Sequence, residues 1–217
     1  AAPFWTSYPD LVNIARAEPV IVFGKEEDDF KLTPADLDRV ATERTRGLII
    51  NSPSNPSGAV SSLTELTEIA EWCKKHGVWL ISDEIYRNIY HEGGGKAAPG
   101  LLDIPEASLG DFVLVDGASK SYAMTGWRVG YSWCVPEVAK KFADLGSQIT
   151  SNTSTPAQVA ALEAYSNVQA AEASISEMAA AFRRRRDLVV ARTKELLPGV
   201  RFVYPRGAFY LYFRVDH

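Results

Sequence analysis

One lysine, Lys120, stands in a run of small residues, and an arginine, Arg128, follows eight positions later. A lysine amine can condense with an aldehyde to form an imine, and a nearby guanidinium can bind a phosphate on the same molecule. The pattern therefore indicates a site for an aldehyde that carries a phosphate. The alternative is an ordinary surface lysine in a loop between strands, because lysine is common on protein surfaces.

Three further segments carry side chains that suit the same chemistry. Asp83 and Tyr86 follow a buried apolar strand, which places a carboxylate and a phenol near its carboxyl end. Asn55 lies in a turn, residues 51–58, that two prolines and a glycine make rigid. Trp5 belongs to a short aromatic cluster. Each segment alone also has a structural explanation, as a helix N-cap, a rigid loop or core packing.

The composition describes a folded protein of 217 residues with 46% apolar side chains and a net charge of −4. Acidic and basic residues are interspersed, which argues against nucleic acid as a partner, and the basic run 183–186 predicts a solvated helix face. No apolar run approaches the length that spans a membrane. Cys73 and Cys134 lack the spacing of a zinc site or a disulfide framework, so we expect no metal site and reduced thiols in the cytoplasm.

Strand and helix patterns alternate along the chain. Apolar runs predict strands at residues 19–23, 47–50, 78–81 and 112–115, and helical periodicity predicts helices at 33–40 and from Ser61 or Ser62 to Gly77. This alternation predicts an α/β fold in which helices sandwich a mostly parallel sheet. Ligands bind such sheets at the carboxyl ends of the strands, where Asn51, Asp83 and Asp116 are expected.

The last part of the chain has a different pattern. A long helix is predicted over residues 168–197, and a Pro-Gly pair ends it. Residues 201–204 and 208–213 then read as strands that open a second sheet. We therefore expect a large domain over residues 1–180 and the start of a smaller α+β domain over residues 181–217.

Together these segments resemble the class I pyridoxal-phosphate aminotransferases, the aspartate aminotransferase-like family of fold type I. Four segments occur in the family's order: the Asn-Pro turn at 51–58, the Asp-x-x-Tyr at 83–86, the lysine attachment signature at 117–130 and the Gly-Ala-Phe-Tyr at 207–210. Trp5, Tyr8 and the run 123–128 are most similar to the bacterial-type aspartate/prephenate aminotransferases.

The resemblance implies three catalytic residues that act with pyridoxal 5′-phosphate. Lys120 would form the Schiff base and then move the proton of the substrate Cα. Asp83 would pair with the pyridine nitrogen and keep it protonated. Tyr86 would hydrogen-bond the phenolic oxygen of the cofactor, and Asn55 would bind the same oxygen.

Three more residues would hold the cofactor if the resemblance is followed. Arg128 would bind the phosphate through two hydrogen bonds, and Ser119 is a weaker candidate for the same group. Trp5 would stack on the ring and fix its tilt.

The implied activity is the transfer of an amino group, by a ping-pong route, from an amino acid such as aspartate or glutamate to a 2-oxo acid. The family resemblance implies a cytoplasmic homodimer that serves amino acid metabolism and binds neither nucleic acid nor membrane. Two alternatives share the fold and cofactor site, the carbon–sulfur lyases and the aminocyclopropane-carboxylate synthases. A non-enzymatic alternative is the aminotransferase-like sensor domain of a transcription regulator.

The resemblance also implies that the sequence is a central fragment. The family's N-terminal phosphate-site elements would precede Ala1, and the arginine that binds the substrate carboxylate would follow His217. We therefore expect these residues alone to bind pyridoxal phosphate poorly and to transaminate weakly or not at all.

Overall fold

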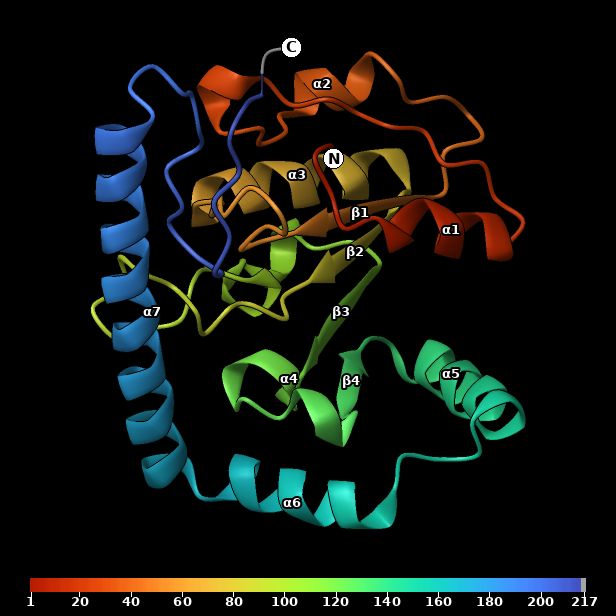
Figure 1. The fold of residues 1–217 in the computed structure, drawn as a ribbon. Helices are drawn as coiled ribbons and strands as arrows, with labels where there is room; N and C mark the ends of the chain where they lie inside the picture. The colour runs from red at the N-terminus through yellow and green to blue at the C-terminus, as the bar shows by residue number, and fades with distance from the viewer. Residues whose placement is uncertain (216–217) are drawn as a thin grey trace.

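The computed structural model describes residues 1–215 and shows one four-stranded sheet with helices around it (Figure 1). The strands are β1 (Gly47–Asn51), β2 (Trp79–Asp83), β3 (Phe112–Gly117) and β4 (Gly130–Trp133), and they lie in that order. β1, β2 and β3 are parallel, whereas β4 is antiparallel to β3. The predicted mostly parallel α/β architecture is confirmed.

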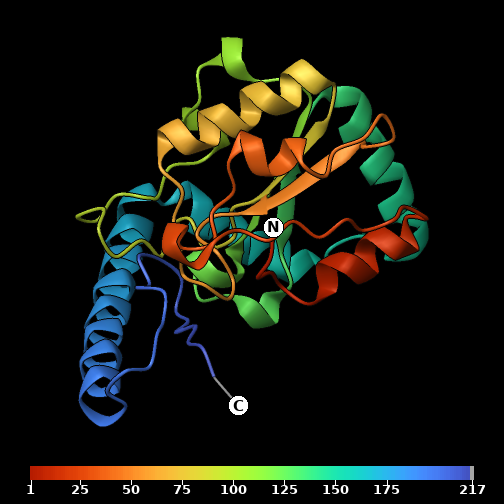
Figure 2. The same ribbon diagram turned by 90° about the horizontal axis from the view of Figure 1, so that it is seen from above.

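The α-helices are α1 (Ser7–Ile14), α2 (Pro34–Asp38), α3 (Leu63–His76), α4 (Ala118–Ser121), α5 (Pro136–Ile149), α6 (Thr155–Ser166) and α7 (Val168–Leu196). The 3-10 helices are η1 (Glu26–Asp28), η2 (Leu101–Asp103), η3 (Glu106–Ser108) and η4 (Thr125–Trp127). α3 lies along the sheet, whereas α7 stands at one side of the molecule with the C-terminal segment beside it (Figures 1 and 2).

Helix α3 forms where the sequence predicts it, because both of its ends are capped. The Ser62 side chain accepts a hydrogen bond from the backbone N–H of Glu65, and the Glu65 carboxylate accepts one from Ser62 N–H at 2.7 Å. Gly77 ends the helix in the left-handed conformation, with φ of 62°. The buried face of α3 then packs on the sheet and carries Leu66, Ile69, Ala70, Trp72 and Cys73.

This packing fixes the register of the strands that carry the candidate site. Leu48 of β1, Leu80 of β2 and Leu114 of β3 are buried in one core with the face of α3. In the resulting register Asn51 is paired with Asp83. The core therefore brings two polar side chains together at the carboxyl edge of the sheet.

Two predictions about strands are wrong in the part of the chain that the structure describes. Residues 19–23 form no strand, and Phe23 makes only an isolated bridge to Ala2. The runs at 201–204 and 208–213 also form no sheet, with a single bridge between Phe202 and Phe213. Residues 19–23 pair only at the isolated bridge to Ala2. The two C-terminal runs do lie side by side, with Val203 N–H bonded to the Tyr212 carbonyl at 3.2 Å, but this pairing is too short to form a ladder.

Sequence patterns did not indicate α1, β4, α5 and α6, although the long helix at 168–197 is confirmed as α7. β4 is exposed along its whole length, and α5 buries no residue. Among the described residues no helix has the length and apolar content needed to cross a bilayer, and no group of His, Cys, Asp and Glu could hold a metal ion.

Two adjacent leucines in η2 allow a matched test of the core. Leu101 is fully buried in the core between α3 and the sheet, whereas Leu102 is 52% exposed. We expect Leu101→Ala to lower the free energy of unfolding by about 2 to 5 kcal/mol, because it leaves a cavity, and Leu102→Ala to change it by less than about 0.5 kcal/mol. Urea unfolding followed by circular dichroism measures both, and equal losses would contradict the described core.

Candidate active site

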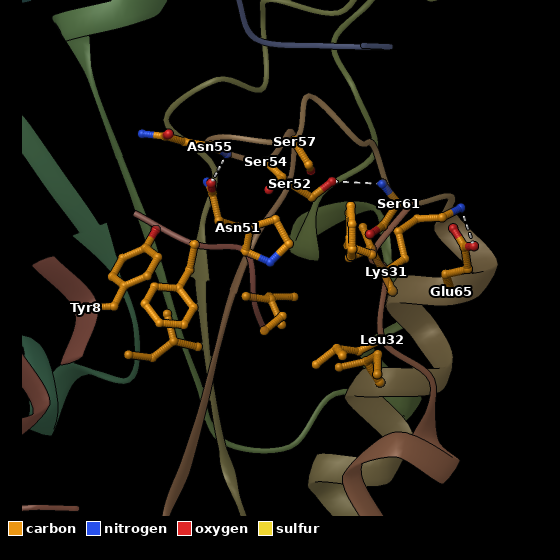
Figure 3. Close-up of a pocket in the computed structure, with 18 residues that line it drawn as sticks. Tyr8, Lys31, Leu32, Asn51, Ser52, Ser54, Asn55, Ser57, Ser61 and Glu65 are labelled. Carbon is orange, nitrogen blue, oxygen red and sulfur yellow. Dashed lines mark hydrogen bonds and ion pairs between the residues drawn. The ribbon is translucent and has the colours of Figure 1, made fainter. Parts of the chain in front are cut away.

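The Asn51 side chain joins the ends of β1 and β2 to the turn that follows β1. Its Nδ2 donates to the backbone carbonyl of Asp83 at 2.8 Å, and its Oδ1 accepts from the backbone N–H of Asn55 at 2.7 Å. Both amide atoms are therefore used, and the turn at residues 51–58 is held against the end of β2. The bond from Asn55 to Asn51 is drawn in Figure 3. This contact sets where the Asn55 side chain lies.

The Asp83 carboxylate is held by two donors. Tyr8 of α1 donates its phenol proton to Oδ2 at 2.6 Å, and the backbone N–H of Ile85 donates to Oδ1 at 3.2 Å. Burial first, and then the negative charge of Asp83, raise the pKa of Tyr8 far above its usual value, so the phenol stays a donor. Trp5 packs edge-to-face on Tyr8, with ring centres 5.5 Å apart. Trp5 is thereby tied to the same carboxylate.

Tyr86 lies in a buried aromatic group just beyond Asp83. Its hydroxyl shares a short hydrogen bond with the Tyr210 hydroxyl, and its ring packs edge-to-face on Phe209 at 5.3 Å. Burial, followed by the bond to Tyr210, raises the pKa of Tyr86, whereas the Asn55 side chain acts to lower that pKa. The Asn55 side chain therefore lies within hydrogen-bonding reach of the Tyr86 hydroxyl.

Lys120 sits in α4, the short helix that directly follows β3. Its Nζ lies 5.7 Å from the centre of the Tyr86 ring and 5.6 Å from the centre of the Phe209 ring. The neighbouring Ser121 accepts a hydrogen bond from Asn88 Nδ2 at 3.0 Å, which ties α4 to the segment after β2. The amine is thus directed to the aromatic group beside Asp83.

The loop from residue 118 to residue 129 carries both Lys120 and Arg128. The backbone N–H of Ala118 donates to Val129 at 3.1 Å and closes the base of the loop on the β3–β4 pair. Ala123 and Arg128 have φ of 53° and 56°, in the left-handed region that is unfavourable for these residues. The surrounding contacts must therefore hold the loop in a strained shape.

The structure brings Asp83, Tyr86, Asn55 and Lys120 together and places Trp5 beside them through Tyr8. The hydrogen bonds that Ser119 and Arg128 make stay inside their own loop. Thr125 Oγ1 donates to the Ser119 carbonyl at 2.9 Å, and Arg128 donates to the Thr125 carbonyl at 3.0 Å. The Arg128 guanidinium is exposed and keeps further N–H donors for a ligand.

The sequence predicts Asn51 at the ligand edge of the sheet but indicates no contact for it, and it indicates neither a contact of Tyr8 with Asp83 nor one of Tyr210 with Tyr86. Tyr8 reads as core packing in the sequence, and its position three residues after Trp5 is the one local signal that links it to the aromatic cluster. Asn51 read as the first residue of a rigid turn. The two contacts that define their roles join residues 75 and 32 positions apart, and local sequence patterns do not report such contacts.

A small cavity of about 60 Å³ is lined in part by the 51–58 turn (Figure 3). Tyr8 and Asn55 line it together with Lys31 and Glu65, which form an ion pair at 2.6 Å. Of the site residues described above, Tyr8, Asn51 and Asn55 line this cavity, and Lys120 does not. A space of this size does not hold an organic cofactor.

Residues 1–217 match the family model described as aminotransferase class I and II. The chain belongs to this family. It is 40% identical over 210 residues to an aspartate aminotransferase of Geobacillus stearothermophilus, which covers 97% of this chain and 52% of that protein. It is 43% identical over 213 residues to an aspartate/prephenate aminotransferase of Cereibacter sphaeroides, and this match also covers 97% of this chain and 52% of that protein.

Solved aminotransferase structures have the same fold. A Thermus thermophilus aspartate aminotransferase with maleate superposes with a TM-score of 0.87 at 40% identity, covering 97% of this chain and 53% of that one. An aspartate aminotransferase of Thermotoga maritima gives a TM-score of 0.88 at 33% identity, covering 100% and 54%. The chain thus spans about half the length of the curated relatives that it matches.

Two glycines at the lysine loop provide a matched test of its geometry. A Cβ at Gly117 would lie 2.7 Å from the Val129 carbonyl oxygen and 2.9 Å from Gly130 Cα, whereas a Cβ at Gly126 would meet nothing within 4 Å. We expect Gly117→Ala to destabilise the closed loop by about 1 to 3 kcal/mol through this overlap, and trypsin to cut after Lys120 and Arg128 at least about tenfold faster. Gly126→Ala should be cut like the parent chain, and equal protection of both variants would contradict this geometry.

Proposed function

We propose that this chain forms most of the cofactor site of a pyridoxal-phosphate-dependent aminotransferase, which moves an amino group from an amino acid to a 2-oxo acid. The carrying observation is the position of the Lys120 amine, 5.7 Å from the Tyr86 ring centre, in a site that also holds the Asp83 carboxylate. The names of the relatives support the reaction class, and aspartate and prephenate in those names suggest the substrates.

The residues present fit pyridoxal phosphate in chemical type. Lys120 offers a primary amine, Asp83 a carboxylate acceptor for a protonated ring nitrogen, and Arg128 an exposed guanidinium for a phosphate. Tyr86 and Asn55 offer a phenol and an amide that can share one oxygen. When bound, the cofactor supplies an aldehyde for the amine and a ring that withdraws electrons from the substrate Cα.

The chain's own residues then have distinct tasks. Lys120 provides the amine that captures the carbonyl and can take and return the proton of the substrate Cα. Asp83 holds its carboxylate in one orientation because Tyr8 and the Ile85 N–H each bind one of its oxygens. Trp5, packed on Tyr8, provides an aromatic face beside that carboxylate.

We further propose that the chain contributes to two domains of a cytoplasmic homodimer. Residues 1–180 would form the large domain and residues 181–217 the start of the smaller one, and Asp216 and His217 lie outside the described residues. A homodimer is supported by the exposed apolar side chains of α5, namely Phe142, Leu145 and Ile149. Both cysteines are unpaired, which agrees with the cytoplasm.

The carbon–sulfur lyase, the aminocyclopropane-carboxylate synthase and the sensor domain are less well supported. All of these would use the same lysine, and the two enzymes differ from a transaminase in the steps after the Cα proton is removed. The relatives at about 40% identity are named as aminotransferases, and this favours amino transfer. An assay that measures a new amino acid and a new 2-oxo acid together, with ammonia measured in parallel, distinguishes transfer from elimination.

Lys120→Ala tests the covalent assignment directly. We expect the protein incubated with pyridoxal phosphate and then borohydride to gain one cofactor mass on the peptide that contains residue 120, and the variant to gain none there. Any transamination of the parent should fall by at least about a thousandfold in the variant, because no other group replaces the amine. Lys96→Ala, in an exposed loop, is the control and should match the parent. Labelling of a different lysine in the parent would contradict the assignment of Lys120.

A further inference from the structure

Asp116 is a partly buried carboxylic acid for which the proposed mechanism has no task. It lies near the end of β3, two residues before α4. Its Oδ1 accepts from the backbone N–H of Gly117 at 2.6 Å, and its Oδ2 accepts from the Tyr131 hydroxyl at 3.1 Å. Tyr131 is also its pairing partner across the β3–β4 ladder.

This carboxyl lies at the base of the loop that carries Lys120 and Arg128. The loop leaves β3 and returns to β4 at the Gly117–Gly130 pair, which is the next pair after Asp116 and Tyr131. β4 is exposed along its whole length, so its pairing with β3 and the Tyr131 bond hold the returning end of the loop. Contacts at Asp116 therefore bear on both ends of the loop.

Three tyrosines from different elements lie near Asp116, whose charge acts on each of them. The Tyr122 ring, which directly follows α4, lies 4.7 Å from the Tyr165 ring of α6, and the Tyr131 ring lies 5.8 Å from the same Tyr165 ring. Tyr122 belongs to the loop, and Tyr131 follows it by two residues. Asp116 is already partly exposed, and opening of the loop would remove part of this cover and increase the contact of the carboxyl with water.

We propose that Asp116 is a positioning residue that governs how firmly the loop at residues 118–129 is held on the sheet, and that its ionised form favours release of the loop. Lys120 and Arg128 lie at the two ends of this loop, so its release would change the position of the amine relative to the guanidinium. The consequence for the cofactor rests on the proposed function, whereas the opening itself does not.

The groups around Asp116 determine whether the closed loop favours its neutral or its ionised form. Burial raises the pKa of Asp116 to about 6, against the lowering effect of the bonds from Gly117 and Tyr131. Glu84 and Asp83 at the end of β2 raise that pKa further. The other titratable groups that face it are the phenols of Tyr122, Tyr131 and Tyr165. The closed loop therefore favours the neutral acid.

In the open loop the hydrated carboxyl would ionise near its ordinary pKa of 3.8. The closed form then binds the proton more tightly than the open form, so the closed loop is most stable below pH 3.8 and loses stability as the pH rises through about 6. The equilibrium constant for opening of the loop rises at most tenfold per pH unit. Between pH 3.8 and about 6 it therefore rises by up to about a hundredfold. Above this range the opening constant levels off.

Hydrogen–deuterium exchange measures this opening without any cofactor. Exchange of the peptide covering residues 118–129 is followed between pH 4.5 and 7.5 and corrected for the intrinsic pH dependence of amide exchange, with the peptide of α3 as internal reference. We expect the corrected exchange of the loop to increase at least about tenfold over this range in the parent. Asp116→Asn keeps the shape but cannot ionise, so its loop should stay protected at every pH.

Two tyrosine variants distinguish the hydrogen bond to Asp116 from the general effect of nearby phenols. Tyr131→Phe removes a hydrogen bond to the ionised carboxyl and should move the midpoint upward by about one pH unit, whereas Tyr122→Phe removes a phenol that makes no hydrogen bond to Asp116 and should leave the midpoint in place. The exchange is measured without any cofactor or substrate, so failure of the proposed function would not affect this result. The proposal is overturned if Asp116→Asn keeps the pH-dependent exchange or if the parent shows none.

Discussion

The site depends on the register between β1 and β2, which pairs Asn51 with Asp83 at the edge of the sheet. From that position one amide side chain binds the end of β2 with its nitrogen and the 51–58 turn with its oxygen. Tyr8 then attaches α1 to the carboxylate. A shift of one residue in this register would turn the polar side chains to the opposite face and separate the turn, the carboxylate and α1.

The part of the site that carries Lys120 and Arg128 is held in place by fewer contacts. Lys120 and Arg128 lie in a loop with left-handed residues, and this loop is closed by an antiparallel strand that is otherwise exposed. The parallel part of the sheet is held by a buried core, whereas this loop is held by a few hydrogen bonds and by tyrosine contacts. The carboxylate side of the site is therefore the more rigid side, and the amine side is the more adjustable one.

The sequence was sufficient for elements whose signals are local. α3 has a capping box and a terminal glycine, and β1 to β3 are apolar runs between turns, so each could be predicted. The same signals failed at residues 19–23, which make only an isolated bridge, and at 201–213, where the pairing of the two apolar runs is too short to form a ladder. Residue types at the site followed from motifs, but the contact of Tyr8 with Asp83 spans 75 positions and only the fold reveals it.

Helix α7 gives the site a mechanical connection to the end of the chain. It is 29 residues long, about 44 Å at the usual rise, and Phe182 on it stacks on Phe209 while Arg186 binds the Pro205 carbonyl. The segment with Tyr210 is thus fastened to the helix, and Tyr210 touches Tyr86. Phe182 and Arg186 lie near the middle of the helix, so a tilt of α7 about either end would carry the segment with Tyr210 along and change its distance from the amine.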